Sequence, residues 1–201
     1  MANFSHPYVS RSEWGGPEAP LLSKLRYTTV THLIIHHTAI SREDEDWPKA
    51  LMDIWKLHVT TRGWDDIGYN FVIDPNGVIY EGRAGGENVR GAHFICANEN
   101  TMGIAVIGNF EETPPPQAAV SSLIELLAWK CREVEIDPLG ANWHSATKLL
   151  LPNIAGHRDG NEAPSDSSAC PVGTVCPGAF LYRLLPAIRQ RVRLAMDDLL
   201  R

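Results

Sequence analysis

The stretch Leu33-Ile34-Ile35-His36-His37-Thr38 decides the fold that we expect for this chain. Its apolar residues follow one another without alternation and include β-branched side chains, which is typical of a strand buried on both faces inside a sheet. We therefore predict a strand from Val30 to His36 and place His36 where that strand reaches the edge of the sheet. Because adjacent side chains of a strand point to opposite faces, we expect His37 to have a structural or supporting role, distinct from that of His36.

The length and composition of the chain fit one globular domain. Its 201 residues are 44% hydrophobic and 21% charged, ordinary values that indicate neither disorder nor a fibrous class. A formal net charge of -6 argues against a nucleic-acid binder, which would gather lysine and arginine along one face. No apolar run reaches the roughly 18 residues that cross a bilayer, so we expect no membrane insertion.

The first 30 residues predict an irregular arm. Glycines and prolines around Gly15 break any regular period, and we expect the arm to pack through Trp14 on a single domain of residues 1–201. The first residues lack the charged segment and apolar segment of a secretory signal, so no signal peptide is visible in this chain. We expect a monomer.

Beyond the first strand, helical and strand patterns follow one another. Asp46 and Pro48 are typical of a helix start, and the Asn-Gly pair in Asp74-Pro75-Asn76-Gly77 is typical of a hairpin turn. The expected elements are a helix from Asp46 to near Gly63, hairpin strands at 69–73 and 78–81, a strand at 102–107, a long amphipathic helix at 119–134, loops at 137–153 and 159–176, and a final helix at 180–200.

Two later segments supply the partners that His36 needs for a metal site. They are Gly156-His157-Arg158-Asp159 and Thr174-Val175-Cys176-Pro177-Gly178. Two imidazole nitrogens and one thiolate are the ligands, in kind and number, of a catalytic zinc site that keeps its fourth position for water. A single histidine is more often a structural residue than a ligand, so the prediction depends on the combined pattern. That pattern indicates a metal-dependent hydrolase.

The four cysteines are too few and too scattered to define a disulfide framework. They are Cys96, Cys131, Cys170 and Cys176. The spacing of Cys170 and Cys176 permits a local disulfide, but a cysteine that binds a metal as a thiolate cannot also be bridged. We therefore expect one of these two cysteines to be free.

Six segments with recognisable motifs follow one another in a fixed order. They are His36-His37-Thr38, Asp66-Ile67-Gly68-Tyr69-Asn70-Phe71, Gly91-Ala92-His93, Gly103 to Phe110, Gly156-His157-Arg158-Asp159 and Cys176-Pro177-Gly178. In this order they resemble the type 2 N-acetylmuramoyl-L-alanine amidases, the family that includes peptidoglycan recognition proteins and phage amidase lysozymes. The likeness runs from Ser10 to about Arg193. It implies an α/β fold with a single domain, in which helices flank a mixed central β-sheet, and a zinc ion in a surface groove. It also implies cleavage of the amide between the lactyl group of muramic acid and L-alanine of peptidoglycan.

By position, the resemblance assigns the zinc ligands to His36, His157 and Cys176. Non-catalytic relatives lack one or more of these residues, so their joint presence argues for an active enzyme. The family usually separates the second histidine from the cysteine by fewer residues, and spacing alone favours Cys170. We prefer Cys176, because the Pro-Gly pair and the helix entry after it match the family, and we interpret 164–173 as an insertion.

The resemblance also assigns two catalytic residues. Tyr69 matches the family's catalytic tyrosine, whose phenol would hydrogen-bond the tetrahedral oxyanion or orient the water. The alternative is a tyrosine packed in a strand. Thr174 stands two residues before Cys176, where phage lysozymes have a lysine and many recognition-protein amidases have a threonine. A hydroxyl can donate a hydrogen bond but carries no charge, so water is an alternative source of the proton for the leaving amine.

The expected substrate-binding residues are Gly63, Trp64, Arg83 and His93. The first three resemble the family's version for meso-diaminopimelate stem peptides, in which the Arg83 guanidinium would pair with the carboxylate that lysine-type stems lack. The alternative is that Arg83 caps a hairpin in solvent. Asn98 and His144 are further candidates for the groove.

Two other function classes stay open. A recognition module that binds muropeptides without cutting them predicts a missing ligand or a missing tyrosine, and this chain lacks neither. A zinc-free cysteine hydrolase would use Cys176 with His157, but a nucleophilic cysteine has no evident reason to precede Pro-Gly. The sequence thus favours an amidase with one Zn²⁺ per chain that acts on peptidoglycan or muropeptides at the cell wall, outside the cell or in the periplasm. Its biological setting stays open.

Overall fold

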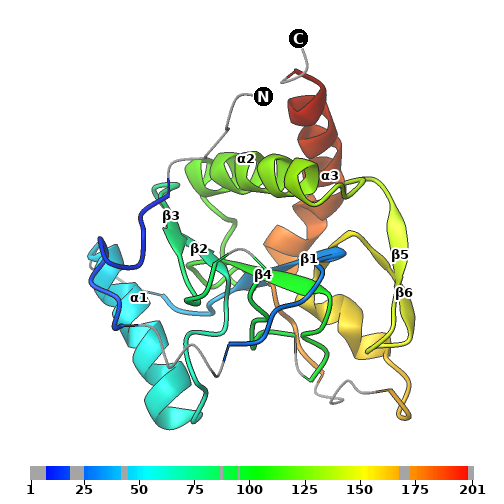
Figure 1. Cartoon of the computed structure of the whole chain (residues 1–201). Helices are drawn as coiled ribbons and strands as arrows, with labels where there is room; N and C mark the ends of the chain where they lie inside the picture. Colours follow the sequence, from blue (N-terminus) through cyan, green and yellow to red (C-terminus); the bar gives the residue numbers. More distant parts are fainter. Residues whose placement is uncertain are drawn as a thin grey trace.

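The chain folds around one central sheet of five strands (Figure 1). The structure, a computed structural model, describes residues 8–18, 25–41, 45–86, 88–94, 96–167 and 173–198. In spatial order the strands are β3 (Ile79–Glu81), β2 (Phe71–Ile73), β4 (Thr101–Val106), β1 (His32–His37) and β7 (Ile154–Gly156). Neighbours pair in parallel, except that β3 runs antiparallel to β2 at one edge. The predicted mixed sheet is confirmed, and β4 lies one residue earlier than the predicted strand at 102–107.

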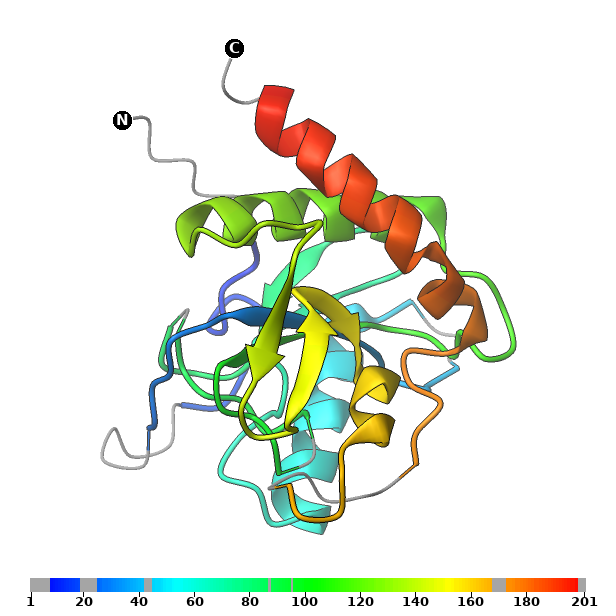
Figure 2. The same cartoon turned by 90° about the vertical axis from the view of Figure 1, so that its right-hand side faces the viewer.

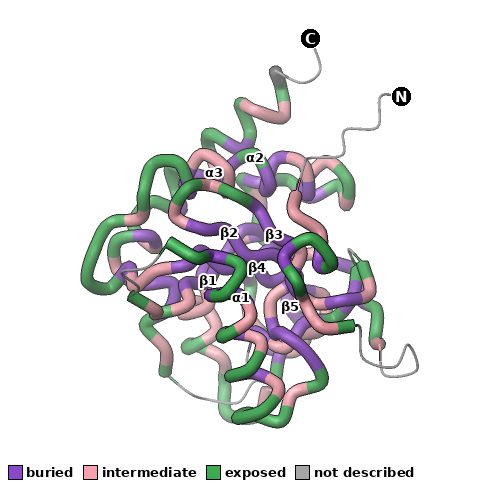
Figure 3. The backbone as a smooth tube through the Cα atoms, turned by 90° about the vertical axis from the view of Figure 1, so that its left-hand side faces the viewer, coloured by how far each residue is buried: buried purple, intermediate pink, exposed green. Residues whose placement is uncertain are grey.

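β1 lies inside the sheet, as its apolar run predicts. It pairs with β4 on one side and with β7 on the other, and all six of its residues are buried. Figure 3 shows the central strands as a largely buried band through the middle of the molecule. Alternation is absent from this stretch because both faces of the strand are covered, so neither face selects polar side chains.

Helices cover both faces of the sheet (Figures 1 and 2). On one face, α2 (Gln117–Glu133) and α3 (Ala179–Asp198) share an apolar core with Leu33 and Ile35 of β1. On the other face, α1 (Trp47–Lys56) packs in a second, smaller core that includes Val72. The helices predicted at 119–134 and 180–200 are therefore confirmed, and so is the α/β class.

The first helix begins as its sequence predicts. The Asp46 side chain accepts a hydrogen bond from the backbone N–H of Lys49 at 3.1 Å, which satisfies one of the free N–H groups of the first turn. The helix continues into a π-helical turn, η2 (Leu57–Thr61), and the chain leaves it at Gly63 with a φ of +70°. Because π-helical turns change which side chains face inward, this turn directs His58 into the protein, where it is buried.

The predicted hairpin is confirmed, since β2 and β3 pair across the Asp74–Gly77 turn. The Asp74 carboxylate accepts hydrogen bonds from the backbone N–H groups of Asn76 and Val78, both at 2.9 Å. Gly77 has a φ of +87°, a conformation that residues with a Cβ atom rarely adopt. Tyr69, which we assigned to the first strand, lies two residues before β2 begins.

The predicted loop at 137–153 is wrong. It contains a second, two-stranded sheet of β5 (Ala141–His144) and β6 (Leu149–Pro152). The hydrophobic pattern did not indicate these strands, because Trp143 faces Leu150 across the pair and both side chains are largely exposed. The apolar residues therefore mark no buried face. The short strand β7 was also missed, because three residues cannot show a period. The predicted loop at 159–176 overlaps a 3₁₀ helix, η3 (His157–Glu162).

The described part of the N-terminal arm packs beside the hairpin. Trp14 is 4% exposed, and its indole N–H donates to the backbone oxygen of Glu81 at 2.8 Å. Arg11 pairs with the buried Asp66 carboxylate at 2.7 Å. Within the described ranges, no helix combines the length and the apolar composition needed to cross a membrane.

Candidate metal and substrate site

The sheet topology brings the three predicted metal ligands together. β1 and β7 are parallel neighbours, with Ile35 beside Gly156, so His36 and His157 emerge next to each other and their ring centroids are 4.7 Å apart. Cys176 lies between η3 and α3, and its Sγ is 3.6 Å from Nδ1 of His36. One ligand atom from each of the three residues lies within 4.8 Å of the other two. This is a compact N, N, S donor set.

Backbone and side-chain hydrogen bonds hold Cys176 in place. The backbone N–H of His37 points at Sγ at 3.4 Å, and Arg158 donates its backbone N–H to the carbonyl of Cys176 at 2.8 Å. Oγ1 of Thr174 accepts from the backbone N–H of Cys176 at 3.1 Å. His37 thus contributes through its backbone, while its ring accepts from the N–H of Phe110 on the other face of the sheet.

The disulfide state agrees with a metal-binding role for Cys176. Cys176 and Cys131 are free and buried, whereas Cys96 is disulfide-bonded. Our expectation that one cysteine of the pair 170 and 176 is free is met by Cys176, and Cys170 lies outside the described residues.

The protonation chemistry of this donor set fits a cation. Nε2 of His157 is buried, and no hydrogen-bond partner for it exists among the residues that the structure describes. Burial lowers the pKa of His157 to about 4 and that of His36 well below its usual value, so both rings are neutral and have a lone pair at neutral pH. Burial also raises the pKa of the Cys176 thiol to about 12. A divalent ion that prefers nitrogen and sulfur, such as zinc, would bind imidazole lone pairs of this kind and stabilise the thiolate.

Tyr69 borders the donor set. Its ring centroid is 5.3 Å from that of His36 and 5.5 Å from that of His58. Burial raises the pKa of Tyr69, and nearby Cys176 raises it further, so the phenol stays protonated and can donate a hydrogen bond at neutral pH. Thr174 lies two residues before Cys176 in the sequence, and its hydroxyl keeps a proton to donate while it accepts from the Cys176 amide.

His58 is a residue of the site region that our sequence analysis did not single out within the predicted helix from Asp46 to near Gly63. Its ring packs on Trp64 with a centroid distance of 4.6 Å, and its Nδ1 accepts from the backbone N–H of Gly68 at 3.1 Å. It therefore links the Trp64 segment to Tyr69. The signal in the sequence was a titratable residue in an otherwise apolar stripe, directly before Gly63-Trp64.

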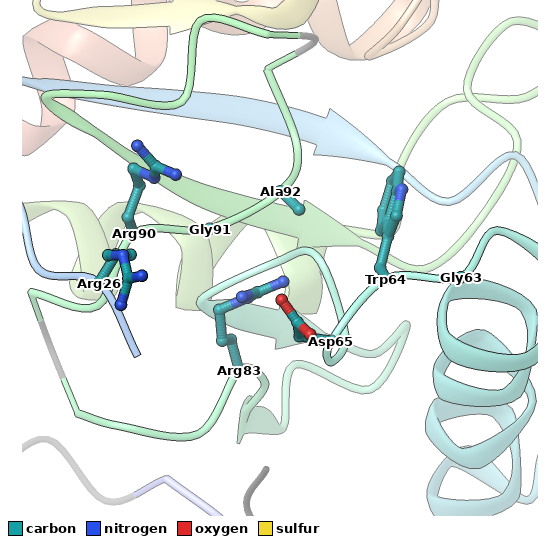
Figure 4. Close-up of a pocket in the computed structure, with 8 residues that line it drawn as sticks. All are labelled: Arg26, Gly63, Trp64, Asp65, Arg83, Arg90, Gly91 and Ala92. Atoms are coloured by element: carbon teal, nitrogen blue, oxygen red, sulfur yellow. The ribbon is translucent and has the colours of Figure 1, made fainter. Parts of the chain in front are cut away.

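Trp64 also lines a pocket of about 250 Å³ (Figure 4). Three of the predicted substrate-binding residues, Gly63, Trp64 and Arg83, line it. The remaining lining residues are Arg26, Asp65, Arg90, Gly91 and Ala92. Arg26 and Arg90 were not predicted. They come from segments far apart in the sequence, which meet where the backbone N–H of Arg90 donates to the carbonyl of Arg26 at 2.7 Å.

Arg83 is anchored in the pocket wall. Its Nε donates to the carbonyl of Ile67 at 3.0 Å. Burial lowers its pKa, while the carboxylates of Asp66 and Asp65 act in the opposite direction. The alternative role of capping a hairpin in solvent therefore does not describe this side chain. Three guanidinium groups and one carboxylate line the pocket, so it has an excess of positive charge.

His93 and His144 are both buried, and neither lines the pocket around Arg83. His93 is 5% exposed, and its Nδ1 lies 3.0 Å from Nε2 of His36. His144 is buried beside His32, and its ring nitrogens bond to Thr147 and to the carbonyl of Glu99. Asn98 accepts hydrogen bonds from the backbone N–H groups of His93 and Phe94. These three residues shape the surroundings of the site from within.

Comparison with known proteins gives consistent matches. A family model described as N-acetylmuramoyl-L-alanine amidase matches residues 26–179. Peptidoglycan-recognition protein LB of Drosophila melanogaster is 33% identical over 177 residues, which are 87% of this chain and 65% of that protein. The human N-acetylmuramoyl-L-alanine amidase is 32% identical over 186 residues, 90% of this chain and 27% of that protein.

A solved structure shares the fold. It is that of peptidoglycan recognition protein LE in complex with tracheal cytotoxin, a monomeric diaminopimelic acid-type peptidoglycan. The TM-score is 0.66 at 28% identity, and the match covers 90% of this chain and 92% of that one. The relatives thus include both recognition proteins and amidases.

Proposed function

The chain belongs to the N-acetylmuramoyl-L-alanine amidase family, and on that premise we propose that it is an active zinc amidase. It would hydrolyse the amide between the lactyl group of muramic acid and L-alanine, in peptidoglycan of the diaminopimelate type. The observation that carries this proposal is the convergence of His36, His157 and Cys176, each of which offers one ligand atom within 4.8 Å of the other two.

The proposed ligands of zinc are His36, His157 and Cys176. A zinc ion held in this way would supply Lewis acidity, which polarises an amide carbonyl and lowers the pKa of water enough to provide hydroxide as the nucleophile near neutral pH. Three protein ligands leave room for water and substrate, as in catalytic rather than structural zinc sites. The buried surroundings strengthen such electrostatic effects, because little water competes for the charges.

Tyr69 and Thr174 have the chemistry to complete the reaction. The protonated Tyr69 phenol, next to His36, would donate a hydrogen bond to the oxyanion that forms when the amide carbon becomes tetrahedral. Thr174 would donate from its hydroxyl on the Cys176 side, where it helps protonate the leaving amine of L-alanine directly or through water.

The arginine-lined pocket supports the diaminopimelate assignment. A meso-diaminopimelate residue carries one carboxylate more than a lysine residue, and the pocket around Arg83 has the positive charge to match it. Arg26 and Arg90 add positive charge to the same cavity. The relative LE is known in complex with a diaminopimelic acid-type ligand, which agrees with this substrate class. The substrate places the action of the protein at the cell wall.

Two alternatives are weaker. A recognition module that only binds muropeptides has no use for a complete donor set with Tyr69 beside it, although several relatives are recognition proteins. A zinc-free cysteine hydrolase needs an exposed thiol with a lowered pKa, whereas Cys176 is 8% exposed and burial raises its pKa.

Mass spectrometry of digests of purified peptidoglycan tests the proposal. The zinc-loaded protein should release intact stem peptides that begin with L-alanine; EDTA should abolish this release and added zinc should restore it. Binding without release would favour the recognition module, and release that survives EDTA would favour the cysteine hydrolase. Cuts in the glycan or inside the stem would refute the proposed bond.

The substrate class is tested with an arginine variant. Arg83→Lys should lower the rate on diaminopimelate-type stems about tenfold, because a bidentate contact is lost. The rate on lysine-type stems should change little. An equal loss on both substrates would assign Arg83 to the structure of the pocket instead.

A further inference from the structure

His93 lies directly behind a proposed metal ligand. Its Nδ1 is 3.0 Å from Nε2 of His36, and the two rings meet edge to face with centroids 5.0 Å apart. The other ring nitrogen of His36, Nδ1, faces Sγ of Cys176. His36 therefore has one nitrogen toward the donor set and the other toward His93.

The hydrogen bonds behind His93 determine where the ring protons lie. Oγ1 of Thr101 donates to the carbonyl of Asn98 at 2.9 Å, which uses its only proton. The same oxygen lies 3.3 Å from Nε2 of His93, so it can only accept there, and Nε2 of His93 must carry the proton of the neutral ring. Nδ1 of His93 is then an acceptor. It takes the Nε2–H of His36, and this leaves the lone pair of His36 on Nδ1.

The protein reserves space for the His93 ring. A Cβ atom at Gly103 of β4 would lie 2.4 Å from the ring, and one at Gly91 would lie 2.5 Å from it. The backbone N–H of His93 is also fixed, because it donates to the side chain of Asn98 at 2.7 Å. The backbone at both glycines thus lies against the ring, which leaves the ring little freedom to turn away from His36.

We propose that His93 is a positioning residue for the metal site, which holds His36 in the Nε2–H tautomer and so presents its Nδ1 lone pair to the cation. Thr101 is the end of this chain of hydrogen bonds and orients His93 in turn. The inference builds on the proposed function, and the expectation that His93 contacts substrate stays a prediction. A ligand histidine whose second nitrogen is fixed in this way binds metal more tightly, because the correct tautomer and ring orientation are already present before binding.

Zinc affinity of the purified protein, measured by competition with a chromophoric chelator, provides the test. His93→Phe keeps a ring of similar size between the glycines but removes the acceptor, and should weaken zinc binding about 10–100-fold. His93→Asn returns an acceptor oxygen near the position of Nδ1 and should recover most of the affinity. Thr101→Val, which loses only the hydroxyl, should weaken binding about 2–10-fold. Wild-type affinity in both His93→Phe and Thr101→Val would overturn the inference.

A second measurement is independent of zinc. Long-range ¹⁵N–¹H correlation spectra of the zinc-free protein should show His36 as the Nε2–H tautomer in the wild type, and a mixture with the Nδ1–H form in Thr101→Val. A wild-type spectrum with His36 protonated at Nδ1 would overturn the inference even if His93→Phe failed to fold. Absence of zinc binding by the wild type would instead overturn the proposed function, so the two failures are distinguishable.

Discussion

The two faces of the central sheet differ in what they contain. Beneath α2 and α3, Leu33 and Ile35 of β1 join one large apolar core. On the opposite face of the same strand, Ile34 belongs to a small apolar cluster with Phe94, and residues of α1 belong to a second cluster. The His36 site lies on this face, where the rings of Tyr69 and His93 are next to the ring of His36. One six-residue strand thus serves stability with one set of side chains and chemistry with the alternate set, because successive side chains point in opposite directions. We therefore expect mutations on the face under α2 and α3 to affect stability, and mutations on the opposite face to affect the chemistry of the site.

The sharpest test of this separation uses Cys176 and Cys131, which are free and buried in the described part of the chain and lie on opposite faces. Cys176→Ala removes a proposed ligand and should lower amidase turnover by at least about 10³-fold, because the ion supplies several kcal/mol of transition-state stabilisation. Its matched control is Cys131→Ala in α2, which should retain turnover and zinc content while it loses about 1 kcal/mol of unfolding free energy. Turnover assays and zinc analysis of both variants check this. Full activity in Cys176→Ala would contradict the assignment of the site.

A core substitution on the α2 face should show the reverse pattern. Leu123 of α2 is fully buried in the large apolar core, so Leu123→Ala should lower the free energy of unfolding by about 2–5 kcal/mol. Urea unfolding of the zinc-free protein measures this loss. Under native conditions the folded fraction should bind zinc as the wild type does. A large loss of zinc affinity in that fraction would mean that the two faces are coupled.

A Tyr69 variant should distinguish a loss of catalysis from a loss of metal binding on the face that carries the site. Tyr69→Phe removes only the phenol oxygen and should lower turnover about 100-fold, as does the loss of one donor to an oxyanion. Zinc content should stay constant, because the phenol is not one of the proposed ligands. Zinc analysis and kinetics of the same variant distinguish a catalytic from a structural role, since a parallel loss of zinc would assign Tyr69 a structural role.

On the face that carries the site, the buried His58 should make the free energy of unfolding depend on pH. Burial lowers the pKa of His58 to about 4, below its value near 6.5 in an unfolded chain. The unfolded state therefore binds more protons between these values, and this contribution to stability is complete above pH 6.5 and is lost as the pH falls toward 4. Between pH 7.5 and pH 5 the loss from this residue should be about 1–2 kcal/mol.

His58→Asn tests this assignment, because asparagine keeps an acceptor for the N–H of Gly68 but does not titrate. Urea unfolding of the wild type and the variant at pH 7.5 and pH 5 gives the comparison. The variant should show a flatter pH dependence by about the same amount. An unchanged slope would mean that other buried histidines carry the effect.

Local chemistry predicted most of the elements. Asp46 as a helix cap, the Asp74–Gly77 turn and the apolar period of α2 each act over a few residues, and each appears where the sequence indicates it. The β5–β6 pair escaped prediction, because the exposed Trp143 and Leu150 follow no burial pattern. β7 escaped because three residues gain their strand conformation only from pairing with β1.

For the site, the motifs along the chain predicted the residue types and their order: two histidines, one cysteine and a tyrosine, in segments typical of one family. The contacts that support these residues come from the fold and could not be predicted, because contacts between segments far apart in the chain leave no local pattern. The parallel pairing of β1 with β7 sets His157 beside His36, and the loop before β4 carries His93 to the back of His36. The pairing of the Arg26 and Arg90 segments likewise adds two charges to the pocket that no spacing could reveal.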